Sequence, residues 1–161
     1  MPPVMTVAAA AIIQDRRLLV VSKKAAPGVF YLPGGKPCPG ETVYQALIRE
    51  LKEELGVRPT RTTLLATFNA MAALELVPMR LTVFSATLTH IPRPAAELAG
   101  LAWTTGTDRY LSLLAPAVRN QVIPLLRRAG QMRLYLAHPA WAPQNRLPPA
   151  SSPGEPGCTP S

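Results

Sequence analysis

The sequence predicts one α/β domain over residues 1–130, followed by a proline-rich tail over residues 131–161 that we expect to be largely disordered. Three observations support this division. Apolar runs of strand length alternate with two segments of helical periodicity, and 48% of the 161 residues are apolar, which is ample for a core. Prolines crowd the final segment, where no periodicity is visible.

The expected strands are apolar runs rich in Val, Leu and Thr. A turn at residues 14–16 separates the first two strands, and residues 25–29 are expected to form a loop. Residues 69–78 form a second expected loop, the one best placed to shape specificity. The expected strands cover residues 4–13, 17–22, 61–68, 79–88 and 100–104.

A first helix is predicted over residues 43–55. Thr42 with Gln45 three positions later is the signature of a capping box. Gly56 suits the left-handed residue just beyond a helix end. Every fourth residue between these limits is apolar and forms one stripe: Val43, Leu47, Leu51 and Leu55.

A second helix is predicted over residues 113–129. Pro116 fits its first turn, and Gly130 marks its end. Pro124 falls inside the pattern and lacks the N–H that a helix needs. We therefore expect this helix to be kinked or split at Pro124.

Acidic residues are concentrated on the first helix, although the chain has only nine of them. Glu50, Glu53 and Glu54 lie three and four positions apart, so they share one helix face. Like charges at that spacing destabilise a helix, and the C-terminal end of its dipole also disfavours anions. A divalent cation would reverse both effects, and Mg²⁺ prefers carboxylate oxygens. The cluster therefore indicates a metal site.

A glycine-rich segment precedes the helix, and it carries one basic side chain, Lys36. Gly34 and Gly35 allow close backbone approach, and the ammonium group of Lys36 suits a phosphate. The segment therefore indicates a site for a phosphorylated ligand.

These residues together resemble the Nudix box, the sequence motif of the Nudix hydrolases. The motif is Gly, five residues, Glu, seven residues, then Arg-Glu-apolar-any-Glu-Glu-any-Gly-apolar. Every fixed position is filled in this chain, by Gly35, Glu41, Arg49, Glu50, Leu51, Glu53, Glu54, Gly56 and Val57.

The resemblance implies the Nudix fold, an α/β/α arrangement in which a mixed β-sheet lies between helices. It implies hydrolysis that depends on Mg²⁺ or Mn²⁺. The residues matching the metal ligands are Glu50, Glu53 and Glu54, together with the backbone carbonyl of Gly34. Glu41 and Arg49 would form a structural ion pair, and Gly35 and Gly56 would be structural residues of the motif.

Two further site residues come from outside the box. Glu97 lies six residues before Trp103 and matches the loop acid of nucleotide-pool-cleaning members. Either Glu53 or Glu97 would act on the attacking water. Lys23 matches a basic residue that reaches substrate phosphates, so Lys36 and Lys23 are the expected substrate-binding residues. The alternative interpretation of both Glu97 and Lys23 is a solvated surface charge.

The expected reaction converts a nucleoside triphosphate, ordinary or oxidised, to a monophosphate and pyrophosphate. Residues 70–75 lack the Pro typical of members that cleave ADP-ribose and the Tyr typical of those that cleave diadenosine polyphosphates. Three alternatives stay open: an ADP-ribose or nucleotide-sugar pyrophosphatase, a nucleotide sensor without catalysis, and removal of a 5′ cap or pyrophosphate from RNA.

The charge of the chain is strongly positive, with 17 basic residues against nine acidic ones and a net charge of +8. No basic run exceeds two residues, so we expect small phosphorylated substrates rather than stable nucleic-acid binding. The two cysteines, Cys38 and Cys158, suggest neither a disulfide framework nor a zinc site. We expect a cytoplasmic protein without a membrane segment; the sequence does not indicate its oligomeric state.

Overall fold

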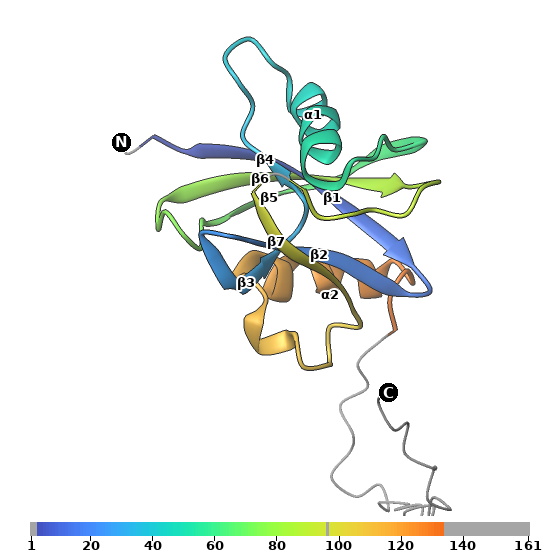
Figure 1. The fold of residues 1–161 in the computed structure, drawn as a ribbon. Coiled ribbons are helices and arrows are strands. Elements are labelled where there is room, and N and C mark those ends of the chain that lie inside the picture. The colour runs from blue at the N-terminus through green and yellow to red at the C-terminus, as the bar shows by residue number, and fades with distance from the viewer. Residues whose placement is uncertain (1–2, 96, 134–161) are drawn as a thin grey trace, which may run out of the picture.

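The computed structural model describes residues 3–95 and 97–133, which form three layers (Figure 1). Helix α1 (Val43–Leu55) lies on one side of a mixed β-sheet, and helix α2 (Ile123–Arg128) lies on the other. The expected α/β/α arrangement is therefore confirmed. The expected tail lies almost entirely outside the described residues.

The sheet contains seven strands in the described part of the chain, with β3-β2-β1-β6-β5 as its main order. Strands β4 and β7 are attached to β1 and β2, respectively. All pairs are antiparallel except β1 with β6, which run parallel from Met5 to Ile12. The strands are β1 (Met5–Gln14), β2 (Arg17–Lys23), β3 (Ala26–Tyr31), β4 (Gly34–Gly35), β5 (Arg61–Met71), β6 (Pro78–Thr87) and β7 (Leu98–Thr104).

The loop expected over residues 25–29 was wrong, because strand β3 occupies most of it. Pro27 and Gly28 disfavour a strand locally, but β3 lies at the edge of the sheet, where a missing N–H is tolerated. Pairing with β2, which aligns Val21 with Tyr31, holds the segment extended.

On the edge that faces away from β6, strand β1 pairs with two different strands. Ala8 and Ala9 pair with Gly35 and Gly34 of β4, whereas only the last residues of β1 pair with β2. The absence of a side chain at Gly34 lets β4 approach the backbone of β1 closely, since a Cβ there would collide with the carbonyl oxygen of Ala8. This pairing places the glycine-rich segment beside the first half of β1.

Alternating residues of β1 and β2 bury opposite sides of the sheet, as the period of a strand requires. On one side Ile12 and Leu19 pack with Leu47 and Leu51 of α1. On the other side the core includes the segment that carries α2, as shown by Leu18, Val20, Val118, Val122, Ile123 and Leu126.

Helix α1 begins and ends where the sequence predicts. Both hydrogen bonds of the Thr42–Gln45 capping box form, and Gly56 is left-handed with a φ of 65°. The buried apolar stripe orients the helix, so that Glu50 and Glu54 face the glycine-rich segment.

The second helical segment differs from the expected single helix. A 3₁₀ helix (Leu111–Leu113) comes first, and a π-helical turn (Val118–Val122) leads directly into α2. The N–H of Ile123 bonds to the carbonyl of Val118, one residue wider than an α-helix. Pro124 has no N–H to donate to the Asn120 carbonyl, and the wider turn accommodates this gap. The helix is therefore distorted at Pro124, as expected. Gly130 has a φ of 73° just beyond the helix, as predicted.

Candidate functional site

Arg49 connects the helix to the segment before it. Its Nε and Nη2 donate to both oxygens of Glu41 at 2.9 Å, a two-point pairing that only a guanidinium can make. Nη2 also donates to the backbone carbonyl of Lys36 at 3.1 Å, and Nη1 contacts Glu50 at 2.9 Å. The expected Glu41–Arg49 ion pair is therefore present, and it fixes the backbone at Lys36.

The Arg49 guanidinium lowers the pKa of Glu41 to about 2. Glu41 also accepts a hydrogen bond from the Cys38 N–H, so its carboxylate holds the loop as well as the helix. Its negative charge is thus committed to structure rather than available to a ligand.

Glu54 is the most buried acid of the cluster, with 5% of its surface exposed. Its Oε2 accepts one hydrogen bond, from the Gly34 N–H at 3.1 Å. Burial raises the pKa of Glu54 to about 7, and the nearby charge of Glu50 adds to that effect. The negative charge of an ionised Glu54 is therefore not neutralised by its surroundings, and a bound cation would neutralise it.

Glu50 lies directly against Gly35. A Cβ at position 35 would collide with the Glu50 carboxylate, so the glycine leaves room for that carboxylate in its present position. Burial raises the pKa of Glu50, although Arg49 partly opposes this. The glycine therefore has a packing role that goes beyond backbone freedom.

Glu53 has a more exposed position than its two neighbours, with 53% of its side chain accessible. Its Oε2 lies 3.3 Å from Nη1 of Arg49. Of the three helix acids, only Glu50 and Glu54 line the adjoining cavity. The metal-binding and catalytic roles expected for Glu53 stay predictions.

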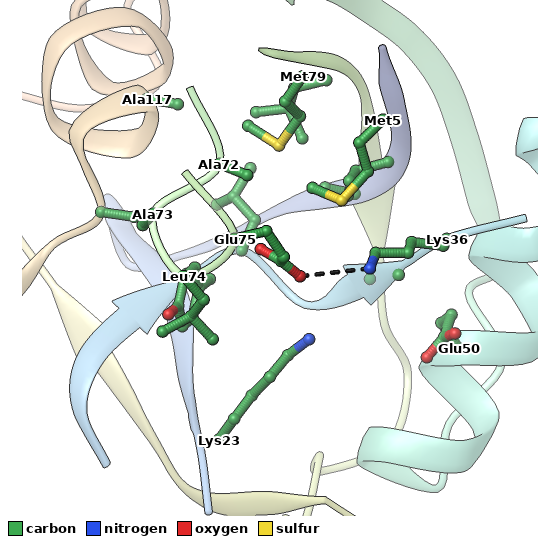
Figure 2. A pocket seen from close by; sticks show the side chains of 18 of the residues that line it. Met5, Lys23, Lys36, Glu50, Ala72, Ala73, Leu74, Glu75, Met79 and Ala117 are labelled. Atoms are coloured by element: carbon green, nitrogen blue, oxygen red, sulfur yellow. Dashed lines mark ion pairs between the residues drawn. The ribbon is translucent and has the colours of Figure 1, made fainter. Parts of the chain in front are cut away.

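A cavity of about 410 Å³ opens beside the acidic cluster (Figure 2). Its polar side contains Glu50, Glu54 and Arg49 of the helix, together with three residues that the sequence singled out from elsewhere. These three are Lys23, Lys36 and Glu97. The structure thus brings both expected phosphate-binding lysines and the expected loop acid to one site.

Glu97 lies in the connection between β6 and β7, which contacts the end of α1. The N–H of Ala95 bonds to the Glu54 carbonyl at 2.8 Å, and the N–H of Lys24 bonds to the Glu97 carbonyl at 2.8 Å. These bonds hold the loop between the helix and the end of β2. Lys23 and Glu97 are thereby placed on neighbouring segments.

The other side of the cavity is apolar. It lies among β1, β6, the connection after β5 and the start of the second helical segment. Figure 2 shows the sulfur atoms of Met5 and Met79 together above the charged residues. The main apolar lining residues are Met5, Val7, Met79, Leu81, Ala117 and Val118.

Glu75 is a site residue that the sequence did not identify. It lies in the turn between β5 and β6, and its Oε1 lies 3.2 Å from the Lys36 Nζ inside the cavity (Figure 2). The turn falls within the expected specificity loop, but no local signal links Glu75 to a lysine far away in the sequence. Only the paired strands bring them together.

Tyr31 is a second residue of the cavity that the sequence analysis did not identify. Its hydroxyl is buried and makes no hydrogen bond to any residue that the structure describes. The side chain lines the cavity, and the Lys23 Nζ lies 6.0 Å from its ring centroid. An unpaired buried hydroxyl is costly, so it is suited to a ligand's polar atom.

The donor set suits a hard divalent cation. Carboxylate oxygens dominate it, and the raised pKa values of Glu50 and Glu54 indicate uncompensated negative charge. Within residues 3–95 and 97–133, no three acidic, histidine or cysteine side chains form a ready-made metal cluster. The ligand set of Glu50, Glu53, Glu54 and the Gly34 carbonyl therefore stays a prediction.

No helix in the described part of the chain is long and apolar enough to cross a membrane.

Comparison with known proteins assigns the domain. The family model described as NUDIX domain matches residues 4–126. The human protein named 8-oxo-dGDP phosphatase NUDT18 is 32% identical over 132 residues, which make up 81% of this chain. The chain spans only 40% of the length of that relative.

Two further comparisons cover nearly the whole relative. The CTP pyrophosphohydrolase of Escherichia coli K12 is 31% identical over 142 residues, which are 83% of this chain and 96% of that protein. The solution structure of the E. coli ORF135 protein superposes with a TM-score of 0.61 at 30% identity. It covers 85% of this chain and 94% of its own.

Proposed function

Because this chain belongs to the NUDIX domain family, we propose that it hydrolyses a nucleoside diphosphate linked to a further group, with a nucleoside triphosphate, ordinary or oxidised, as the favoured substrate. The products of that reaction would be a nucleoside monophosphate and pyrophosphate. One observation supports the proposal above all others: the buried Glu54, the half-buried Glu50, two lysines and an apolar wall line the same cavity.

The family uses divalent metal ions, and we propose Mg²⁺, with Mn²⁺ as a substitute, for this member. Glu50 and Glu54 would hold the ion, with Glu53 and the Gly34 carbonyl as further ligands. When bound there, the ion would neutralise phosphate oxygens and acidify water.

The lysines supply the remaining positive charge. Lys36 extends from the glycine-rich segment and Lys23 from the end of β2, so they approach a bound polyphosphate from two sides. Charge that develops on the phosphate oxygens as the anhydride bond breaks would be stabilised by both.

A carboxylate must orient the attacking water and accept its proton. Glu97 is the better candidate of the two that the sequence offered, because it lines the cavity, whereas Glu53 lies outside the lining in the described structure. Water would attack phosphorus, the phosphoanhydride bond would break, and the leaving phosphate oxygen would depart with the bond electrons.

The apolar wall suits the nucleobase. Met5 and Met79 provide flexible, polarisable surfaces that adapt to a flat ring. The names of two relatives, an 8-oxo-dGDP phosphatase and a CTP pyrophosphohydrolase, also support a nucleotide substrate. A cytoplasmic location would suit such a substrate, and it stays a prediction.

The test is a panel of nucleoside triphosphates, nucleoside diphosphates, ADP-ribose and nucleotide sugars, each incubated with Mg²⁺ or Mn²⁺ and analysed by mass. Reaction in ¹⁸O-labelled water would show which phosphorus is attacked. Glu54→Gln and an excess of EDTA serve as controls. The proposal predicts monophosphate and pyrophosphate from a triphosphate. Tight binding of a nucleotide without any turnover would instead indicate a sensor.

A further inference from the structure

The cavity contains an acid at a place where a phosphate-binding site would be expected to have none. Glu75 pairs with Lys36 at 3.2 Å, and Figure 2 shows the Lys23 ammonium group pointing toward the same carboxylate. The question is what this carboxylate does when a polyanionic substrate arrives.

The position of Glu75 is imposed by its turn. The N–H of Leu76 bonds to the Ala72 carbonyl at 3.0 Å, and the N–H of Ala72 bonds to the Val77 carbonyl at 2.9 Å. Leu76 adopts a left-handed φ of 55°, and Ala72 is buried. A hydrogen-bonded turn anchored in this way projects Glu75 into the cavity in a defined direction.

The position of Lys36 is fixed separately. Its backbone carbonyl accepts a hydrogen bond from Arg49, which is itself held by Glu41. The Lys36 side chain is therefore held at its backbone end only. Its ammonium group can leave Glu75 for another anion without a change in the backbone.

The electrostatic environment shows that the two lysines act on Glu75. Burial alone raises the pKa of the Glu75 carboxyl, but its own backbone N–H and the charges of Lys36 and Lys23 outweigh this and lower it. Glu75 is thus ionised, and it neutralises part of the positive charge that a phosphate would meet.

The pair is too exposed to serve as a structural tie. Lys36 is 57% exposed and Glu75 is 43% exposed, and ion pairs in such surroundings contribute little to folding. A weak pair is easily broken by a competing anion. Its effect should therefore fall on ligand affinity and not on stability.

We propose that Glu75 is a specificity-determining residue, an internal counter-ion that competes with substrate phosphate for Lys36 and so limits how tightly the site holds polyphosphate. The inference rests on the proposed function, because it assumes that Lys36 is a phosphate-binding residue. Each bound phosphate must displace the Glu75 carboxylate or remain beside it. Both outcomes weaken the binding of the more highly charged ligands.

The experiment measures binding without turnover. Inorganic pyrophosphate is titrated calorimetrically into the full chain at a fixed, saturating Mg²⁺ concentration. Glu75→Gln keeps the size and the hydrogen-bonding oxygen of the side chain but removes its charge. We expect its Kd for pyrophosphate to be about two- to five-fold lower than that of the wild type, the range of a partly exposed ion pair.

Asp15→Asn is the matched control, because it changes the net charge by the same amount at the exposed β1–β2 turn. Asn tolerates the left-handed φ of 50° at this position. We expect Asp15→Asn to leave the Kd unchanged. Thermal melts of both variants would show whether either substitution disturbs the fold.

A double-mutant cycle tests the route through Lys36. Lys36→Gln should weaken pyrophosphate binding, and the gain from Glu75→Gln should be smaller in that background. The proposal is overturned if Glu75→Gln matches Asp15→Asn, if it weakens binding, if its gain is undiminished without Lys36, or if the wild type does not bind pyrophosphate. Because no turnover is needed, a failure of the hydrolysis assay alone would leave this result intact.

Discussion

The Glu54 carboxylate accepts a hydrogen bond of 3.1 Å from the backbone N–H of Gly34, which lies in β4. This contact joins the last turn of α1 to the edge of the sheet. It also uses one carboxylate oxygen for structure and leaves the other for a ligand. Glu54 therefore combines a positioning contact with the largest rise in pKa that the acidic cluster shows.

Glu54→Gln should separate these two roles. The amide oxygen can still accept from Gly34, but the charge needed for a cation is gone. We expect Mg²⁺ affinity to fall by more than about 100-fold, since loss of a ligand should exceed the 10–100-fold that outer partners cost. Calorimetric titration with Mg²⁺ measures this.

In EDTA the same variant should melt no lower than the wild type, because it removes a buried charge that lacks a cation. Unchanged Mg²⁺ affinity in Glu54→Gln would remove this residue from the metal site.

Gly35→Ala should damage the site through packing. The added methyl would collide with the Glu50 carboxylate, which must move. Because the displaced atoms are the flexible end of the Glu50 side chain, we expect only a small loss in the free energy of unfolding, together with clearly weaker metal binding. Urea denaturation and Mg²⁺ titration measure the two effects.

Gly28→Ala is the matched control for that substitution, because a Cβ at position 28 would meet nothing within 4 Å. It should leave both properties nearly unchanged. Equal effects at the two positions would show that the Glu50 contact does not explain the glycine.

The Glu41–Arg49 pair predicts a loss of stability in acid. The folded-state pKa of Glu41 is about 2, below its ordinary value of 4.5. A lowered pKa means that the stabilisation is fully present above pH 4.5 and is lost as the pH falls toward 2. Thermal melts of wild type and Glu41→Gln across this range should therefore converge at low pH. Parallel curves would contradict the assignment.

Glu97 and Glu53 should differ in their effect on turnover. Glu97→Gln removes a carboxylate of the cavity, so we expect kcat to fall by about 100-fold or more while substrate still binds. Glu53→Gln should act chiefly through the metal and should recover at high Mg²⁺. Steady-state kinetics over a range of Mg²⁺ concentrations distinguishes them. Recovery of Glu97→Gln by Mg²⁺ would reverse the two roles.

Local signals explain what the sequence predicted well. Helix α1 was located at both ends because Thr42, Gln45 and Gly56 interact only with near neighbours. The distortion at Pro124 was also predictable, since it follows from a missing N–H. The form it took, a π turn ahead of the proline, depends on how Val118 and Val122 pack against the sheet.

Interactions between distant segments explain what the sequence did not predict. Strand β3 exists because β2 pairs with it, despite Pro27 and Gly28. Glu75 joins the site because the β5–β6 turn lies beside the glycine-rich segment. The residues next to Glu75 in the sequence do not indicate a contact with Lys36. Both features depend on how distant strands pair in the sheet. Local sequence patterns carry no information on that pairing.

The split edge of β1 has a consequence for how such a protein can diversify. Glu54 of α1 is positioned by a backbone contact to β4, whereas much of the apolar wall is built from side chains of β1 and β6. Under the proposed function, exchanging Met5 or Met79 would reshape the surface that meets the nucleobase while leaving the acidic cluster in place. Substrate preference could then change without loss of hydrolysis.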